Sequence, residues 1–244
     1  LQTPRYKLAG GDITVINGTA HWSYSLAPDS LYNTWRIKQD GAVYVRMNTQ
    51  NKDVDVARQE FKYGQGMAVF DDYLWQLKRN DYNNDYRDPF VVKHEGELYM
   101  AVPYVDYNHK FRALPVPQMY STPEFGGVKM VDSDGNIEDL SPEEAQEDAR
   151  LQGQNFYPYD LAKFKVNSMR YQHGFLNKMF THKDQLQLAH VPGQGNDQPF
   201  TVMTEEDGIT YFLAAEPYGE QTHGIYQVWQ VDARTGEMER KTYD

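Results

Sequence analysis

The stretch PFVVKHEGELYMAVPY, residues 89–104, decides the fold, because its pattern returns at residues 199–218 as PFTVMTEEDGITYFLAAEPY. In each copy an apolar strand leads through an acidic-Gly turn into a longer strand rich in aromatic and aliphatic residues. Each copy is followed by a Gly, a further apolar strand and an Asp-to-Gly turn, within residues 126–140 and 224–240. Self-similarity on this scale predicts a duplicated supersecondary unit.

Helical patterns precede both copies. Apolar residues recur at helical intervals over residues 67–77, and a second helix is expected over residues 158–180. Ser141, followed by Pro142 and then by Glu144, is a capping-box start for a further short helix. Residues 48–60 are polar and lack a clear period, which predicts a loop or a frayed helix start.

A helix followed by three strands is expected twice along the sequence, and this order predicts the fold class. We expect an α+β protein of two duplicated helix-plus-antiparallel-sheet units, with a β-rich N-terminal segment. The first domain, residues 1–140, would hold that segment and the first helix/three-strand repeat. The second domain, residues 141–244, would hold a helical segment and the second repeat. At 244 residues the chain is long enough for two such modules.

Composition excludes several functional classes. The chain has 35 acidic and 24 basic residues, a formal net charge of −11, so nucleic acid and anionic membrane are poor partners. The absence of cysteine excludes disulfides, thiol catalysis and Cys-ligated zinc. No apolar run approaches the roughly 20 residues that cross a bilayer, so we expect no direct membrane insertion of this chain.

No complete catalytic or metal-binding motif occurs. Asp132, Asp134 and Asn136 have the alternating spacing of a calcium loop, with Glu143 at the twelfth position, but Ile137 stands where such a loop needs glycine. A hairpin turn explains the same residues. The sequence also lacks HExxH, GxSxG and the glycine-rich nucleotide motifs. We therefore expect no catalytic residue, no metal and no cofactor.

The first copy is longer than the second, because a Pro-bearing segment, residues 108–124, separates two of its strands. Insertions into repeats lie in loops on one face, which is often the binding face. Exposed aromatic and Met side chains commonly anchor interfaces. The alternative is that these side chains only pack the loop onto the sheet. The candidate binding residues are Tyr104, Tyr107, Phe111, Met119 and Tyr120.

One resemblance suggests an enzyme. Residues 87–92, RDPFVV, resemble the strand opening of five-bladed propeller glycosidases. The resemblance implies a carbohydrate-active hydrolase in which Asp88 is a base or a substrate-orienting carboxylate and Glu124 or Glu216 is the second acid. The second copy departs from the motif, because Gln198 replaces the acid.

A second resemblance covers more of the chain. VWQVDARTGEME, residues 228–239, preceded by the PF strand, the acidic-Gly turn and the aromatic strand, is similar to the ending of PepSY-like modules. These are small helix-and-sheet units of extracytoplasmic and membrane-anchored bacterial proteins. Both copies share the pattern, over residues 67–140 and 155–244. The resemblance implies a non-enzymatic role, an extracytoplasmic or cell-surface location and an anchor upstream of Leu1.

The leading hypothesis is therefore a tandem PepSY-like domain that binds, senses or assembles with a protein partner or with further copies of itself. Two alternatives stay open. The first is the hydrolase that uses Asp88. The second is a structural component of a surface or viral assembly, which would show large apolar patches and self-association.

Overall fold

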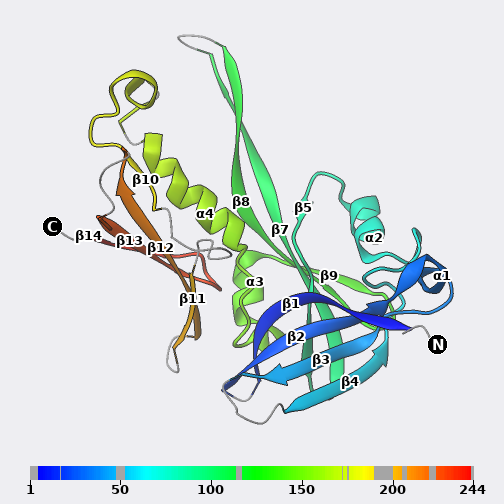
Figure 1. Ribbon diagram of the computed structural model, residues 1–244. Coiled ribbons are helices and arrows are strands. Elements are labelled where there is room, and N and C mark those ends of the chain that lie inside the picture. Colours follow the sequence, from blue (N-terminus) through cyan, green and yellow to red (C-terminus); the bar gives the residue numbers. More distant parts are fainter. Residues whose placement is uncertain are drawn as a thin grey trace. The chain divides into compact units, whose positions relative to one another are not determined.

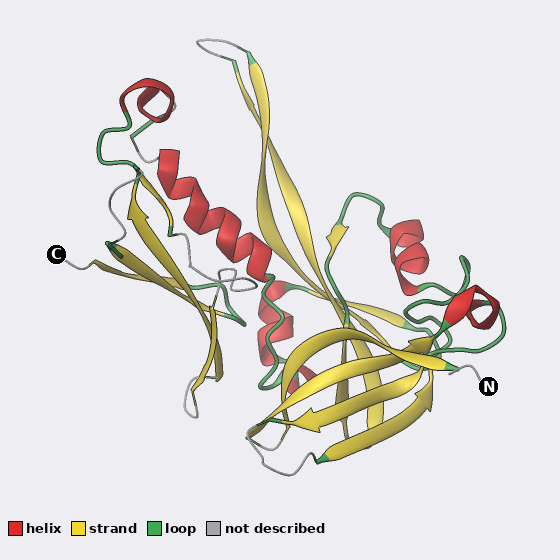
Figure 2. Ribbon diagram, viewed as in Figure 1, coloured by secondary structure: helices red, strands yellow, loops and turns green. Residues whose placement is uncertain are grey.

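The computed structural model contains three antiparallel sheets with short helices, which confirms the expected α+β class (Figure 2). The chain divides into two compact units, Leu1–Phe156 and Tyr157–Asp244. The structure describes residues 5–16, 18–47, 53–113, 117–171, 173–174, 176–189, 200–204, 208–219 and 224–242.

The first sheet is a four-stranded meander in the order β1-β2-β3-β4 (Figure 1). Its strands are β1 (Tyr6–Ile16), β2 (Thr19–Pro28), β3 (Asp40–Arg46) and β4 (Val54–Glu60), and α1 (Ser30–Thr34) lies between β2 and β3 in the chain. The segment expected to be a loop or a frayed helix start, residues 48–60, instead contains the strand β4. Residues 48–52 of that segment lie outside the described residues. Pairing with β3, such as Val43 with Val56, forms this strand despite its polar composition.

The second sheet has the order β5-β7-β8-β9, with β6 also paired to β7. Its strands are β5 (Asp85–Tyr86), β6 (Phe90–His94), β7 (Glu97–Arg112), β8 (Gln118–Val131) and β9 (Ile137–Leu140). The loop expected over residues 108–124 is wrong, because β7 and β8 stay paired out to Arg112 and Gln118. Cross-strand pairing outweighs the proline signal, since Pro123 lies on a strand with no outer neighbour at that point, where proline is tolerated.

Both faces of the second sheet are buried, so its strands supply two apolar clusters. On one face Met100 and Val102 pack with Tyr44 of β3 and with Leu77 of α2 (Tyr73–Asn80). On the other face Phe90, Val92 and Met130 pack with Leu151 and Phe156. Successive residues of a strand point to opposite faces, which explains how neighbours such as Val91 and Val92 join different clusters.

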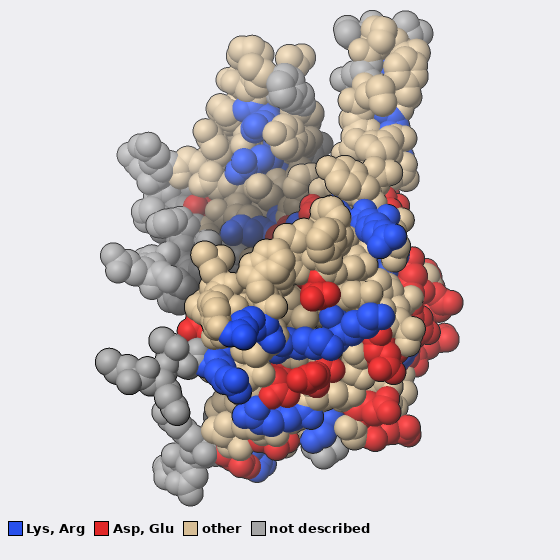
Figure 3. Space-filling model, turned by 90° about the vertical axis from the view of Figure 1, so that its right-hand side faces the viewer, with Lys and Arg blue, Asp and Glu red and all other residues tan. Residues whose placement is uncertain are grey.

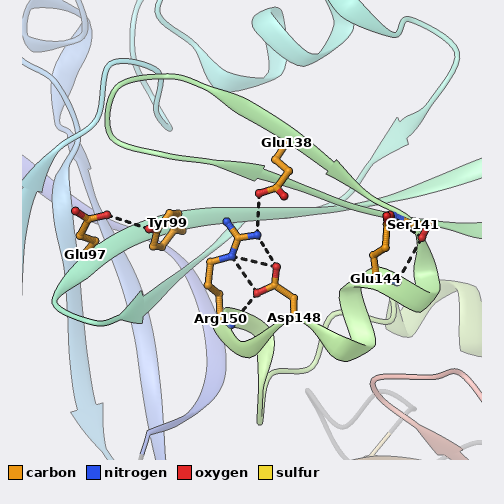
Figure 4. Close-up of polar contacts among 7 residues, drawn as sticks. All are labelled: Glu97, Tyr99, Glu138, Ser141, Glu144, Asp148 and Arg150. Atoms are coloured by element: carbon orange, nitrogen blue, oxygen red, sulfur yellow. Dashed lines mark hydrogen bonds and ion pairs between the residues drawn. The ribbon is translucent and has the colours of Figure 1, made fainter.

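The helix α3 (Pro142–Glu147) begins at the capping box expected from the sequence. The Ser141 hydroxyl accepts from the Glu144 backbone N–H at 3.3 Å, and the Glu144 carboxylate accepts from the Ser141 backbone N–H at 2.9 Å (Figure 4). Hydrogen bonds from Ser141 lower the pKa of Glu144. Two of the backbone donors that a helix start leaves unpaired are thus satisfied.

Arg150, in a 3-10 turn that follows α3 (Ala149–Leu151), ties this segment to the sheet (Figure 4). Its guanidinium donates to Asp148 and, at 2.8 Å, to Glu138 of β9, and it lies 5.2 Å from the centre of the Tyr99 ring on β7. Hydrogen bonds from Arg150 lower the pKa of Asp148. Because α3 and this turn pack on β6 and β8, the first compact unit continues past Leu140 to Phe156.

The second unit places α4 (Tyr159–Asn167) against a five-stranded sheet. The helix buries Leu161, Ala162 and Val166, and β12 buries Tyr211 and Leu213. The helix expected over residues 158–180 is too long, because after Asn167 the chain forms a 3-10 turn (Ser168–Tyr171) and a π-helical turn (Asn177–Thr181). The strands are β10 (Leu186–Leu188), β11 (Phe200–Thr204), β12 (Gly208–Pro217), β13 (Gln227–Asp232) and β14 (Met238–Thr242).

The second and third sheets have the same strand order. The third runs β10-β12-β13-β14 with β11 also on β12, which matches β5-β7-β8-β9 with β6 on β7. Each is a five-stranded sheet rather than the expected three-stranded meander. One short strand, β5 or β10, comes between the helix and the meander in the chain, and another, β9 or β14, follows the Asp-to-Gly turn. Val131 pairs with Met100 and Val231 pairs with Tyr211, and each valine is followed by an Asp that starts a turn.

Candidate interaction surface on the β7–β8 arm

The outer parts of β7 and β8 form a two-stranded ribbon that extends beyond the rest of its sheet (Figure 1). We call residues 106–112 and 118–124 the arm. β5 pairs with β7 only at Tyr104 and Val105, and β9 pairs with β8 no further out than Val128. No strand in the described part of the chain pairs with the outer edge of either arm strand. Such edges present unpaired backbone groups that another chain can use.

The arm leaves the sheet at a bulge between Tyr104 and Val105, where two glycines of β8 lie opposite. A Cβ atom on Gly126 would lie 2.3 Å from Cε2 of Tyr104, so the tyrosine ring rests directly on the glycine backbone. Gly127 has a φ of +131°, and a Cβ atom there would lie 2.0 Å from the Leu140 carbonyl oxygen. Only glycine fits these two positions without a shift of the surrounding backbone or ring.

Tyr104 belongs to the base of the arm rather than to its surface. The ring is 8% exposed, and its hydroxyl donates to Asp139 at 3.1 Å. The Lys129 ammonium donates to the same carboxylate at 2.5 Å and lies 5.0 Å from the centre of the Tyr104 ring. Burial, together with the charge of Asp139, raises the pKa of Tyr104 above its usual range. Tyr104 therefore stays neutral and acts as a packing residue.

Tyr107 fixes the first part of the arm to its neighbour β5. Its ring is half-buried, and its hydroxyl donates to Asp85 at 3.1 Å. Arg87 holds the same carboxylate at 3.0 Å. Burial, followed by the hydrogen bond to Asp85, raises the pKa of Tyr107. The side chain therefore positions the arm and offers only part of its ring to a partner.

The other three predicted residues lie together in the outer arm and are exposed. Phe111 pairs directly with Met119, and Tyr120 pairs with Lys110. Phe111 is 69% exposed, Met119 77% and Tyr120 46%. The structure thus places Phe111, Met119 and Tyr120 in the outer arm, with Tyr120 on the face opposite the Phe111–Met119 pair, and places Tyr104 and Tyr107 at its base.

The arm has two chemically different faces. Side chains alternate along a strand, so the Phe111–Met119 pair shares its face with His109 and Ser121, whose Nδ1 and Oγ atoms lie 2.7 Å apart. The opposite face carries Lys110, Arg112 and Tyr120. The sequence prediction did not include Lys110 and Arg112, although their alternation with the aromatic residues is visible once the segment is read as a strand.

The arm is locally basic in an acidic protein. Between Asp106 and Glu124 the described arm carries Lys110 and Arg112 and no carboxylate, whereas the whole chain has a net charge of −11. A ribbon with an apolar pair on one face and cations on the other suits a partner with apolar and acidic groups.

The candidate calcium residues form a turn instead. Both oxygens of the Asp132 carboxylate accept hydrogen bonds from Asn136, one from its backbone N–H at 2.8 Å and one from its side chain at 2.7 Å. Glu143 lies in the first turn of α3. Among the described residues no group of three His, Cys, Asp or Glu side chains is arranged to hold a metal ion.

Comparison of the chain with protein-family models, curated proteins and solved structures gave no match. Within the described residues, no helix combines the length and apolar character needed to span a membrane.

Proposed function

We propose that this protein is a non-enzymatic extracytoplasmic domain, built from two duplicated PepSY-like units, that binds or assembles with a protein partner through the β7–β8 arm. The observation that carries the proposal is the exposed Phe111–Met119 pair on a ribbon whose outer edges pair with no other strand in the described part of the chain. Phe111 and Met119 are exposed and belong to neither buried cluster of the sheet, so core packing does not explain these two side chains.

The duplication is supported by equivalent contacts around the Asp-to-Gly turns. In the first unit the Lys62 backbone N–H donates to the carbonyl of Ser133, one residue after Asp132. In the second unit the Tyr157 backbone N–H donates to the carbonyl of Ala233, one residue after Asp232. Each turn also ends on a glycine with positive φ that lies against a tyrosine ring, Gly135 on Tyr63 and Gly236 on Tyr157. Shared strand order and shared turn contacts favour descent from one unit.

The hydrolase alternative rests on Asp88, and one observation bears on it. Burial raises the pKa of Asp12 to about 6, and the charge of Asp88 adds to the increase. Asp12 is thus a carboxylate whose pKa Asp88 influences. A raised pKa next to a second acid is a feature of glycosidases. The helix-covered sheets, however, favour the binding role, because a propeller repeats bare four-stranded blades around an axis.

A retention experiment tests the proposal. Immobilised wild-type protein and a Phe111→Ser/Met119→Ser variant would be exposed to the detergent-solubilised cell envelope of the source organism, and retained proteins identified by mass spectrometry. The control is Leu8→Ser, which removes another exposed apolar residue, 56% exposed on β1. We expect a discrete partner that the wild type and control retain and the arm variant does not. Equal retention by all three proteins would refute the proposal.

Sedimentation velocity of the same three proteins separates a foreign partner from self-assembly. Loss of a concentration-dependent oligomer in the arm variant alone would assign the arm to assembly of this chain with itself. This is the behaviour expected of the surface or viral assembly alternative.

A further inference from the structure

The exposed side of α2 forms a second surface of the first unit, separate from the arm residues. The helix α2 buries only Leu77 among its eight residues. Residues 74, 75, 78, 79 and 82 recur at helical intervals, so they lie on one stripe. Leu74 is 38% exposed, Trp75 46% and Tyr82, just beyond the helix end, 80%. A solvent-facing stripe with this much aromatic surface is unusual for a helix that packs on a core.

The stripe forms one wall of a groove. The cavity has a volume of about 840 Å³ and is lined by Met67, Val69, Asp72, Leu74, Trp75, Lys78, Arg79 and Tyr82. Its size lies in the range of ligand pockets, about 300–1,000 Å³. Phe70 extends the apolar wall, because its ring meets the Trp75 ring edge-on with the centres 6.0 Å apart.

Hydrogen bonds hold the groove in shape without a ligand. The Asp72 carboxylate caps α2 by accepting from the backbone N–H groups of Leu74 at 2.9 Å and Trp75 at 3.3 Å. The loop before the helix is tied to α1, since the Ala68 backbone N–H donates to the Thr34 carbonyl at 2.9 Å. A preformed site loses less conformational entropy when it binds.

The charges of the groove favour an anionic occupant. Its carboxylate, Asp72, is already used as the helix cap. The Lys78 ammonium donates to the carbonyls of Tyr82 and Asn84, and it lies 5.6 Å from the centre of the Tyr82 ring. Arg79 makes no hydrogen bond or ion pair within the described residues. Figure 3 shows the side of the molecule that carries α1 and α2, where Lys and Arg side chains lie among Asp and Glu side chains and next to uncharged surface.

We propose that this groove binds a peptide segment of a protein partner in which an acidic residue stands next to an aromatic or large aliphatic residue. Trp, Tyr and Arg dominate the energetics of protein interfaces, and all three line this groove. Arg79 would pair with the carboxylate, for which its guanidinium offers two parallel donors. Trp75, Leu74 and Val69 would cover the apolar side chain.

The inference goes beyond the proposed function, because it assigns a second recognition site with its own ligand chemistry. It does not depend on the arm. The Phe111→Ser/Met119→Ser variant should bind the groove ligand as the wild type does, so failure of one proposal leaves the other standing.

Fluorescence anisotropy with three labelled peptides tests the proposal. The peptides share a Gly-Ser frame around the cores Asp-Leu-Phe-Glu, Lys-Leu-Phe-Lys and Asp-Ser-Ser-Glu. We expect the acidic-apolar peptide to bind the wild type at least about tenfold more tightly than the other two. Trp75→Ala should weaken that binding about tenfold, and Arg79→Glu should weaken it while strengthening binding of the basic peptide.

Two matched controls lie directly after α1 in the chain. Trp35→Ala removes an exposed Trp, 69% exposed, and Arg36→Glu reverses a cation that lies 4.7 Å from the Tyr32 ring. Both should bind the acidic-apolar peptide as the wild type does. Equal binding of all three peptides, or an equal loss in Trp75→Ala and Trp35→Ala, would overturn the proposal. Unchanged circular dichroism and thermal unfolding would show that every variant is folded.

Competition with dodecanoate below its micelle concentration distinguishes a peptide from a free amphiphile. We expect no displacement of the acidic-apolar peptide at equimolar dodecanoate. Full displacement, with dodecanoate binding lost in Trp75→Ala, would assign the groove to an apolar carboxylate and overturn the peptide proposal.

Discussion

Phe111 lies directly opposite Met119 at the outer end of the β7–β8 ladder, and both side chains face solvent. The ribbon that carries this pair has a fixed base, because the Tyr104 ring packs against Gly126 and the Tyr104 hydroxyl donates to Asp139. The base and the outer arm therefore have different roles, so substitutions in them should have different effects. Changes at the base should alter stability, and changes in the outer arm should alter binding.

Gly126→Ala should destabilise the protein by about 1–3 kcal/mol, because a methyl group there would overlap the Tyr104 ring. Urea unfolding followed by circular dichroism measures the change. Gly224→Ala is the matched control, since a Cβ atom at Gly224 meets nothing within 4 Å. The control should change the free energy of unfolding by no more than about 0.5 kcal/mol. Similar losses in both variants would show that the glycine–tyrosine packing is unimportant.

Asp12→Asn should stabilise the protein above about pH 6. Burial raises the pKa of Asp12 from 3.8 to about 6, so between these values the folded state binds more protons than the unfolded state. Stability therefore falls as pH rises through this window and stays lower above it. The carboxylate oxygen that accepts from Asn155 is kept as an amide oxygen in the variant, and the buried Asn155 Oδ1 has no hydrogen-bond partner among the described residues.

The expected gain is on the order of 1–3 kcal/mol at about pH 7 and close to zero near pH 4. Urea unfolding of the variant and the wild type across this range gives the difference directly. Asp134→Asn, at an exposed turn position, should show no such pH-dependent gain. A gain for Asp12→Asn that does not depend on pH would show that ionisation of Asp12 is not its cause.

Ser141→Ala should cost about 1 kcal/mol of stability, because it leaves the Glu144 backbone N–H without its cap. Ser141→Thr keeps a hydroxyl acceptor and should retain most of that stability. Thermal unfolding of the two variants provides the comparison, and hydrogen exchange in α3 reports whether the loss is local. If the two variants are equally destabilised, packing at Ser141 rather than capping is responsible.

The repeated strands and the capping box could be predicted from the sequence because local residue patterns specify them. The PF strands are short apolar runs next to an acidic-Gly turn, and the Ser141–Glu144 contact needs only four neighbouring residues. β4 and the outer arm were missed for the opposite reason. Their residues are polar or interrupted by proline, and they become strands only by pairing with β3 or with each other.

The candidate surfaces were predictable to different extents. The aromatic content of residues 108–124 indicated the outer arm, but Tyr104 could not be distinguished from Phe111, because burial of one ring depends on Gly126, far along the chain. The α2 groove was missed. Helical spacing predicted a helix over residues 67–77, whereas the helix starts only at Tyr73 and turns Leu77 inward.

Photo-crosslinking from the outer arm tests the central claim most directly. A benzoylphenylalanine would replace Phe111 in one protein and Phe164, 55% exposed on α4, in a control, and each would be irradiated in the native cell envelope. The account predicts one discrete adduct from position 111, suppressed by excess wild-type protein but not by the Met119→Ser variant, and none from position 164. The absence of an adduct at position 111, or the same adduct from both positions, would contradict a partner-binding arm.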